Sequence, residues 1–503
     1  MTYKKALNDY PWTREFLWHA AVPLALLLIV FLFFPSRQRF QFDDDEGYEL
    51  MKASLVDSGY KLYDQIWDDQ TPLLTYFFAS GIHFFGNKVS VARYQVLFFS
   101  CVLIWAVFQT LRLSLGNRYA IAGAILILML PFYLQLSVSA MQAIPNLAFA
   151  MLALLALMKW HKTHHYVWLV LSPLALGISI LIKLFTGFLA PVFAIGILIG
   201  EIAGLANKRK WYKALLPAFL WGVILILILV VAGIGLIGLE NLDQVLGTHL
   251  KAIDFANRNP NWTIANQIKV SLAFLLLGWM GAISLLIKRK WFALYPLTWM
   301  VLAYLMLAFN YPVWYHQQLL VTLPAALLGA YAAVEGFELL KSALKILRPH
   351  FPLTSRNLLQ MISFLGILLV FLRFPEGLKV LNPFPTLSGS GLALGIKDAE
   401  TLALMSNYAP QTKWIVTDSP MFAFRCRLPV PPELAVFSSK RILAGLIMEE
   451  EITEAIQQYH PEQVLFTKHV FPEVEKYLLE NDYTIIQSYQ DTRLYLQHDM
   501  PIQ

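Results

Sequence analysis

The residues best suited to chemistry form an acidic run directly after the first long apolar segment. Asp43, Asp44, Asp45 and Glu46 are consecutive. Adjacent carboxylates repel one another, so their affinity for protons and cations rises unless something neutralises them. A general base or a ligand for a divalent cation would use that property. The alternative is that the run is an ordinary solvated face.

The stretch after the acidic run is rich in aromatic residues, which a loop that only adds solubility does not need. Residues 59–64 read Gly-Tyr-Lys-Leu-Tyr-Asp and include Tyr63, and residues 67–76 contain Trp67 and Tyr76. Residues 72–85 are apolar but too short to span a bilayer, which predicts a helix lying along the interface. We therefore expect a structured loop over residues 36–89.

Three further candidates lie near the ends of later apolar segments. A lysine at mid-membrane costs roughly 2.5–3.5 kcal/mol, so Lys183 needs an anionic partner such as a lipid phosphate, or it snorkels to the interface. His316 lies where a loop re-enters the membrane and is either a site residue or an interfacial hydrogen-bonding group. Arg258 is either a phosphate or acceptor contact or a plain surface arginine.

The composition indicates a membrane protein. Of 503 residues, 57% are hydrophobic and only 14% are charged, against roughly 25% charged in a soluble domain. The net charge of +6 comes largely from short Lys/Arg clusters at the ends of apolar segments, which mark the cytoplasmic side and do not indicate nucleic acid. Cys101 and Cys426 fall in different environments, so a disulfide between them is not expected.

Apolar runs of ~20 residues, long enough to cross a bilayer, predict a helical body of about eleven spans. They lie at 16–35, 90–111, 119–137, 143–159, 166–182, 185–203, 214–238, 267–287, 291–309, 317–336 and 358–374. Clusters such as Lys208–Lys210 and Lys288–Lys290 alternate with loops poor in cations, which predicts a cytoplasmic N-terminus. The first span has no cleavage site after it and is expected to remain. The first loop and the tail are then external.

The tail changes character near residue 374. Short β-type runs at 414–417, 463–466, 483–486 and 493–496 alternate with helical stretches, which is typical of a small α/β domain. We expect a transmembrane body over residues 1–374 and an external accessory domain over 375–503, without a phosphate-binding glycine motif or a nucleophile elbow.

The first loop resembles that of the GT-C superfamily of integral-membrane glycosyltransferases. The resemblance lies in Asp45-Glu46-Gly47-Tyr48, then Gly59-x-x-x-Tyr63-Asp64, then Pro72-Leu73-x-x-Tyr76; residues 177–187 and 315–328 are similar to later motifs. The nearest relatives look like protein O-mannosyltransferases and the aminoarabinose transferases that modify lipid A. The resemblance implies hexosyl or pentosyl transfer, with inversion, from a polyprenyl-phosphate donor to a lipid, glycan or protein acceptor outside the cytoplasm, at the inner (plasma) membrane.

The resemblance also assigns roles to residues. It makes Asp45 the catalytic aspartate and Glu46 its acidic neighbour. Relatives often carry a second acid in the turn between the third and fourth spans, but residues 139–146 have none. Gln142 or Asn146 could fill that place, or Asp43 and Asp44 could compensate.

The chemistry of such a transfer fits these residues. A carboxylate that removes the acceptor's proton contributes typically 10²–10⁴-fold in rate, and we assign this role to Asp45. A phosphate leaving group needs no general acid, but its growing charge needs stabilisation, for which Lys183 is the first candidate. Further candidate donor-phosphate or substrate contacts are His316, Asp44, Tyr63 and Arg258. A divalent metal (Mg or Mn) could bridge Asp45 and the donor phosphate.

Two rival functions use the same features differently. A transporter or flippase of lipid-linked saccharides would show internal repeats and charges at the midplane of spans, and we find neither an obvious repeat nor an ionisable pair within spans. A non-catalytic subunit or sensor would leave the acidic run, Lys183 and His316 unexplained. The sequence therefore favours a transferase.

Overall fold

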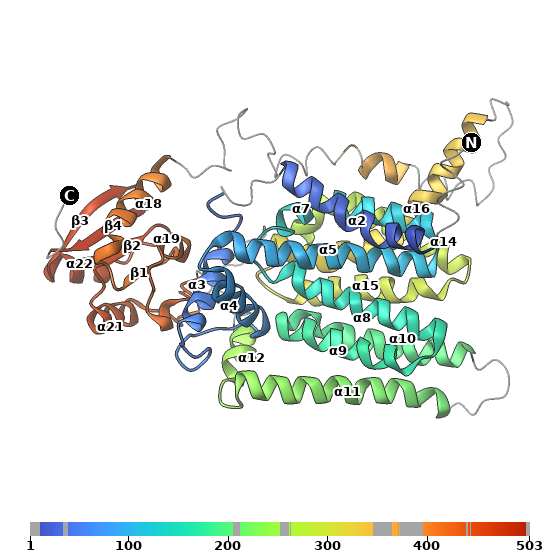
Figure 1. The fold of residues 1–503 in the computed structure, drawn as a ribbon, viewed down its shortest axis with the longest axis horizontal. Coiled ribbons are helices and arrows are strands. Elements are labelled where there is room, and N and C mark those ends of the chain that lie inside the picture. The colour runs from blue at the N-terminus through green and yellow to red at the C-terminus, as the bar shows by residue number, and fades with distance from the viewer. Residues whose placement is uncertain are drawn as a thin grey trace.

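The computed structural model describes residues 11–33, 39–204, 212–251, 261, 263–345, 365–370, 372, 396–438, 441–442 and 444–498. Within these ranges the chain forms a bundle of long helices, with a small domain containing a sheet at one end (Figure 1).

Seven helical stretches in the described residues are long and apolar enough to cross a membrane. Two of them are single helices, Val89–Ser114 (α5) and Ala143–Thr163 (α8). The others are Leu184–Ile202 (a 3-10 turn and most of α10, Leu189–Gly204), Leu215–Ile237 (within α11, Tyr212–Ile237), Ile264–Ile287 (ending with α14, Leu272–Ile287), Trp291–Phe309 (ending with α15, Leu294–Phe309) and Tyr315–Glu338 (a 3-10 turn and most of α16, Leu319–Lys345). Most of α8 and α16 is buried, whereas most of α11 is exposed. Because the exposed side chains of α11 are apolar, that helix is suited to face lipid.

The helical membrane body is confirmed, and its helices match the predicted spans. Three further spans correspond to helices with shorter apolar parts, α2 (Pro11–Phe33), α6 (Asn117–Met129) and α9 (Tyr166–Ile182). The eleventh, 358–374, is described only at residues 365–370 and 372, so the number of spans stays a prediction. The expected interface helix is α4 (Leu73–Phe85).

The third predicted span departs from a continuous helix. The α6 helix ends at Met129, and residues 130–142 continue as turns around the short helix α7 (Tyr133–Leu136), with Phe132 in the left-handed region at φ 63°. Backbone without regular hydrogen bonds is tolerated at membrane depth only where protein or a cavity surrounds it. Most of this segment is buried, and its last residues reach the cavity described below.

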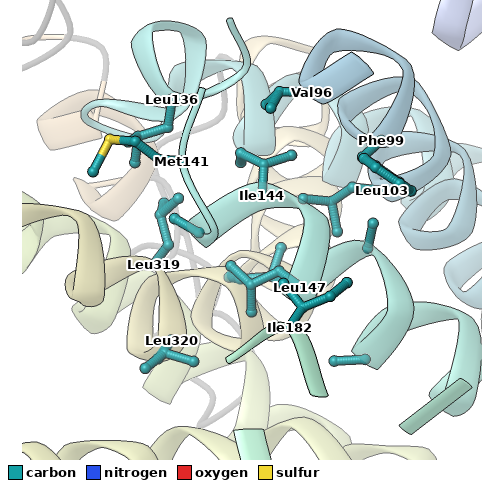
Figure 2. Close-up of a cluster of buried hydrophobic side chains, with 14 of the residues drawn as sticks. Val96, Phe99, Leu103, Leu136, Met141, Ile144, Leu147, Ile182, Leu319 and Leu320 are labelled. Carbon is teal, nitrogen blue, oxygen red and sulfur yellow. The ribbon is translucent and has the colours of Figure 1, made fainter. Parts of the chain in front are cut away.

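A buried apolar cluster packs against part of that segment. It joins α5, the start of α8, the end of α9 and the start of α16 to residues 136–141 (Figure 2). Its labelled members are Val96, Phe99, Leu103, Leu136, Met141, Ile144, Leu147, Ile182, Leu319 and Leu320. Burying such side chains fixes the positions of the loops that leave these helices.

The first loop and the tail lie together at one end of the bundle. Helix α3 (Asp45–Asp57) lies between the membrane helices and the tail domain and packs against α4 and against α19 (Pro420–Cys426) of the tail (Figure 1). The short helix α12 (Leu242–Lys251) follows α11 on the same side.

The tail forms the expected α/β structure. Its sheet has the order β1-β2-β4-β3, in which β1 (Ile415–Thr417) pairs parallel with β2 (Gln463–Phe466). Strand β4 (Thr492–Gln497) pairs antiparallel with β2 and with β3 (Tyr483–Tyr489). The helices are α18 (Ile396–Tyr408), α19, α21 (Glu449–Tyr459) and α22 (Pro472–Glu480). Cys101 and Cys426 are both free thiols. The proposed boundary at residue 374 lies outside the described residues.

Candidate active site

A cavity of about 410 Å³ lies where the first loop, the ends of several membrane helices and the tail domain meet. Its lining residues from the first loop are Asp43–Asp45, Tyr48, Glu49, Lys52 and residues 68–70. The others are residues 141–143, 183–185, 310–312 and 314–317 at helix ends, with Val436 and Ser438 of the tail. The charge pattern of the sequence predicted the first loop and the tail on the same side of the membrane. In the structure both segments meet the turn at Lys183 and the loop 310–316 at this cavity.

The three aspartates at the start of α3 are held differently. One carboxylate oxygen of Asp43 accepts a hydrogen bond from the backbone N–H of Asp45 at 2.9 Å, and the other accepts one from the Tyr315 hydroxyl at 2.8 Å. Asp44 accepts a hydrogen bond from Gln41 and forms an ion pair with Lys468. The Asp45 carboxylate has no hydrogen-bond or ion-pair partner among the described residues. Of the three, Asp45 alone is left with all its acceptor positions available.

The surroundings of Asp45 favour its protonated form. Its side chain has access to the cavity, but protein encloses it at longer range, and this desolvation together with the charge of Asp43 raises its pKa to about 8. The charges of Glu49 and Asp44 act in the same direction, whereas the charge of Lys183 lowers the pKa. A carboxyl group whose pKa lies near the working pH suits general-base catalysis.

The Glu46 carboxylate is fully engaged by hydrogen bonds within the protein. Its carboxylate accepts hydrogen bonds from the Arg93 guanidinium at 3.0 and 2.7 Å and from the backbone N–H groups of Phe42 and Ala140 at 2.6 and 2.7 Å. The Glu46 and Arg93 side chains are both fully buried, and neither lines the cavity. This pair joins the first loop to α5 and to the irregular segment 130–142, and its placement gives Glu46 no contact with a substrate in the cavity.

Lys183 and His316 come from different spans and meet in the cavity. The α9 helix ends at Ile182, which leaves Lys183 at its C-cap, and His316 lies in the 3-10 turn Tyr315–Gln318 that begins α16. Lys183 Nζ lies 3.4 Å from His316 Nε2. Because an ammonium group can only donate, Nε2 must accept, which assigns the proton of a neutral ring to Nδ1. That buried Nδ1 has no hydrogen-bond partner among the described groups.

The remaining predicted residues do not share one environment: of Tyr63, Asp44 and Arg258, the structure places only Asp44 at the cavity. Tyr63 is buried with a backbone φ of 72°, and its hydroxyl donates to the Gln70 carbonyl at 2.7 Å. It therefore shapes the loop 61–70 and does not line the cavity. Asp44 lies at the cavity rim beside the tail domain. Arg258 falls outside the described residues.

A buried cluster of charged side chains on the same helix as Asp45, one and two turns further on, was not predicted from the sequence. Lys52 Nζ forms ion pairs with Glu49 at 3.1 Å and with Asp68 at 2.7 Å, and Gln142 donates to the same Glu49 oxygen at 3.2 Å. All four residues line the cavity. The spacing of Asp45, Glu49 and Lys52 on α3, i, i+4 and i+7, is the signal that could have identified one helix face.

Glu49 bears on the expected second acid. The second oxygen of Glu49 is buried without a hydrogen-bond partner among the described groups. Gln142, considered for the missing acid's place, is hydrogen-bonded to Glu49. A second carboxylate thus reaches the cavity from α3 itself. Asn146, by contrast, does not line it, and its carbonyl accepts a hydrogen bond from Ser179.

The described residues hold no group of three His, Cys, Asp or Glu side chains arranged to bind a metal ion. A divalent cation at Asp45 would need further ligands from the donor phosphate and water. The described side chains on their own therefore do not form a binding site for such an ion.

The fold and this cavity together define a class, the polytopic membrane proteins with a GT-C fold. The crystal structure of ArnT from Cupriavidus metallidurans in the apo state matches with a TM-score of 0.62 and 14% identity, over 95% of this chain and 97% of that one. The same protein bound to undecaprenyl phosphate gives 0.57 and 14%, over 97% and 98%. The Archaeoglobus fulgidus oligosaccharyltransferase in the apo form gives 0.55 and 12%, over 89% and 69%.

The sequence gives a more particular match. A family model described as dolichyl-phosphate-mannose-protein mannosyltransferase matches residues 69–234. This segment contains Lys183 and begins after Asp45. No match was found among curated protein sequences. The resemblance to the GT-C superfamily is thereby confirmed, and the chain is an integral membrane protein.

Proposed function

We propose that this chain is a glycosyltransferase that moves a sugar from a polyprenyl-phosphate donor to a lipid, glycan or protein acceptor on the non-cytoplasmic face of the membrane. The observation that carries the proposal is the pairing, in one cavity, of an unpartnered carboxylate with a lysine whose charge acts on it. The cavity also opens among loops that the charge pattern places outside the cytoplasm.

The side chains suggest one sequence of steps. Asp45 takes the proton of an acceptor hydroxyl or amine as that atom attacks the anomeric carbon of the sugar. The bond from the anomeric carbon to the phosphate oxygen breaks, and its electron pair leaves with the phosphate. We assign to Lys183, which contacts His316 in the cavity, the stabilisation of the developing charge. A single displacement of this kind inverts the anomeric configuration.

Solved structures with the same fold support the lipid part of the proposal. One is ArnT bound to undecaprenyl phosphate. Another is the archaeal oligosaccharyltransferase AglB from Archaeoglobus fulgidus in complex with an inhibitory peptide and a dolichol-phosphate. Both ligands are polyprenyl-type phosphates, the class of carrier that we propose for this chain. The orientation follows as part of the same proposal, with the N-terminus in the cytoplasm and the tail domain outside the inner membrane.

The test is mass spectrometry of lipids and envelope glycans in a strain that lacks the protein. We expect a glycan or glycolipid to lose one sugar and the wild-type gene to restore it. Asp45→Asn should fail to restore the product. The matched control is Asp57→Asn at the last residue of the same helix, where Asp57 pairs with exposed His83. Restoration of the product by Asp45→Asn at normal protein level would refute the proposal.

A further inference from the structure

The tail domain contributes directly to the cavity. Val436 and Ser438 line it, and the carbonyl of Phe437 between them accepts a hydrogen bond from the Tyr48 hydroxyl of α3 at 3.0 Å. Arg425 of α19 donates to the carbonyls of Arg39 and Phe40 just before the acidic run. The first loop and the tail are thus joined by hydrogen bonds on both sides of the catalytic candidate.

One ion pair connects the tail to the residue next to Asp45. Lys468 Nζ lies 2.9 Å from an Asp44 carboxylate oxygen, with the Lys468 side chain 28% exposed and that of Asp44 51% exposed. Asp44 is the N-cap residue of α3, and Asp45 is the first residue of that helix. A partly exposed pair contributes little to global stability. The Asp44 carboxylate that Lys468 binds nevertheless belongs to the residue directly before the proposed base.

The backbone that carries Lys468 is firmly held. Asp418 follows β1 and is fully buried, and its carboxylate accepts hydrogen bonds from the backbone N–H groups of Thr467, Lys468 and His469 at 2.9, 2.9 and 3.0 Å. These three residues follow β2, the parallel neighbour of β1. Because the N–H groups are fixed by one buried acceptor, the Lys468 side chain starts from a defined position.

We propose that Lys468 is a positioning residue for Asp45: by binding Asp44 it compensates one of the like charges beside Asp45, so that the external domain forms part of the catalytic site. The inference rests on the proposed function in that it takes Asp45 as the base. It gives the tail a role in the reaction beyond that of an accessory domain.

The groups around Asp45 give the direction of the effect. From its own loop, Asp43, Glu49 and Asp44 oppose its ionisation, and from the end of α9, Lys183 favours it. Tyr48 on α3, and Tyr315 and His316 at the start of α16, line the same cavity. Removing the Lys468 charge leaves Asp44 uncompensated and therefore raises the pH at which Asp45 ionises. For carboxylates of adjacent residues at a solvent-exposed rim, Coulomb's law in water gives a change of roughly half a pH unit.

The test measures Asp45 directly and does not need the substrate. A water-soluble carbodiimide with an amine couples to protonated carboxyl groups, and peptide mass spectrometry of the purified full chain follows the labelling of Asp45 between pH 5 and pH 10. We expect Lys468→Met to move the midpoint upward by about half a pH unit and Lys468→Arg to restore it. Asp44→Asn should move the midpoint downward, because Lys468 is left as an unpaired positive charge, and adding Lys468→Met to Asp44→Asn should bring the midpoint back close to that of wild type.

The control is Lys476→Met, at an exposed lysine on α22 of the same domain, which should leave the midpoint unchanged. The proposal is overturned if the Lys468→Met curve superimposes on that of wild type, if Lys476→Met shifts equally, or if the curve of the double variant does not return toward that of wild type. Transfer in complemented cells is scored separately. Its absence in wild type would refute the proposed function, whereas an unshifted labelling curve with normal transfer would refute only the role of Lys468.

Discussion

Replacing Lys52 with methionine would leave two buried carboxyl groups without their shared cation. The Lys52 side chain is 1% exposed, and it bridges Glu49 and Asp68, which are 8% and 0% exposed. Removing one partner of a buried ion pair typically costs about 3–5 kcal/mol, because the remaining charge has neither water nor a counter-ion. For a cooperative unit of a few hundred residues this corresponds to a drop of roughly 4–10 °C in the unfolding temperature.

The pH dependence makes this prediction sharper. Burial already raises the pKa of Asp68 to about 7, although Lys52 opposes the rise. In the variant the pKa of Asp68 rises further, so the folded state holds its proton at a pH where the unfolded state has lost it. Stability then falls as pH rises. The deficit of Lys52→Met relative to wild type should therefore be small near pH 5 and grow between pH 7 and pH 9.

The assay is thermal unfolding of the purified chain in detergent, followed by tryptophan fluorescence at several pH values. Lys88→Met, at an exposed lysine of the same loop, is the control and should match wild type. The double variant Lys52→Met with Asp68→Asn should recover part of the loss, since it removes one unpaired charge. An unfolding temperature for Lys52→Met within ~1 °C of wild type at pH 8 would refute the reasoning.

Further predictions concern the cavity. Because Asp45 must be ionised to act as a base and its pKa is raised to about 8, transfer by wild type should rise with pH and level off above about pH 8; a rate independent of pH from 6 to 9 contradicts this. Lys183→Ala should weaken binding of undecaprenyl phosphate by about 10–100-fold, which is the contribution of a hydrogen bond to a charged group. The control is Lys162→Ala at an exposed lysine. Equal affinities of Lys183→Ala and wild type would exclude the phosphate role. Glu49→Met should lower transfer at least tenfold if its unpartnered oxygen binds substrate, and unchanged transfer would make Glu49 a structural residue. Purified protein in vesicles should not move labelled lipid-linked sugar across the bilayer, and rapid movement would favour the flippase.

The membrane body could be predicted because each span is decided by its own sequence. An apolar run of about 20 residues has few alternatives to a membrane helix. The strands β1 to β4 were similarly predictable from short β-branched and aromatic runs, although β3 extends three residues beyond its predicted end. The interrupted third span was not, because the turn at Phe132 is stabilised by packing against distant segments.

Part of the candidate site could also be predicted from local sequence patterns. Lys183 was selected by the rule that an ionisable group at a span end needs a partner, and His316 by its place where a loop re-enters the membrane. Asp45 was selected by the resemblance of its loop to that of the GT-C superfamily. The difference between Glu46 and Glu49 depends on where α3 begins, since one residue of helical phase rotates a side chain by about 100°. Glu46 points to Arg93, and Glu49 points to the cavity. Contacts such as Asp44 with Lys468 join segments far apart in sequence, which no local pattern reveals.

The bonds around Glu46 also bear on how the protein is made. Synthesis delivers Glu46 and Arg93 early, and the two can pair once α5 has entered the membrane, which removes the penalty of an uncompensated arginine. Arg425, which donates to the carbonyls just upstream of the acidic run, leaves the ribosome much later. The loop that carries Asp45 would thus reach its final shape only after the tail domain has been synthesised and has folded against it, so a nascent chain arrested before that point would hold an inserted bundle with an immature cavity.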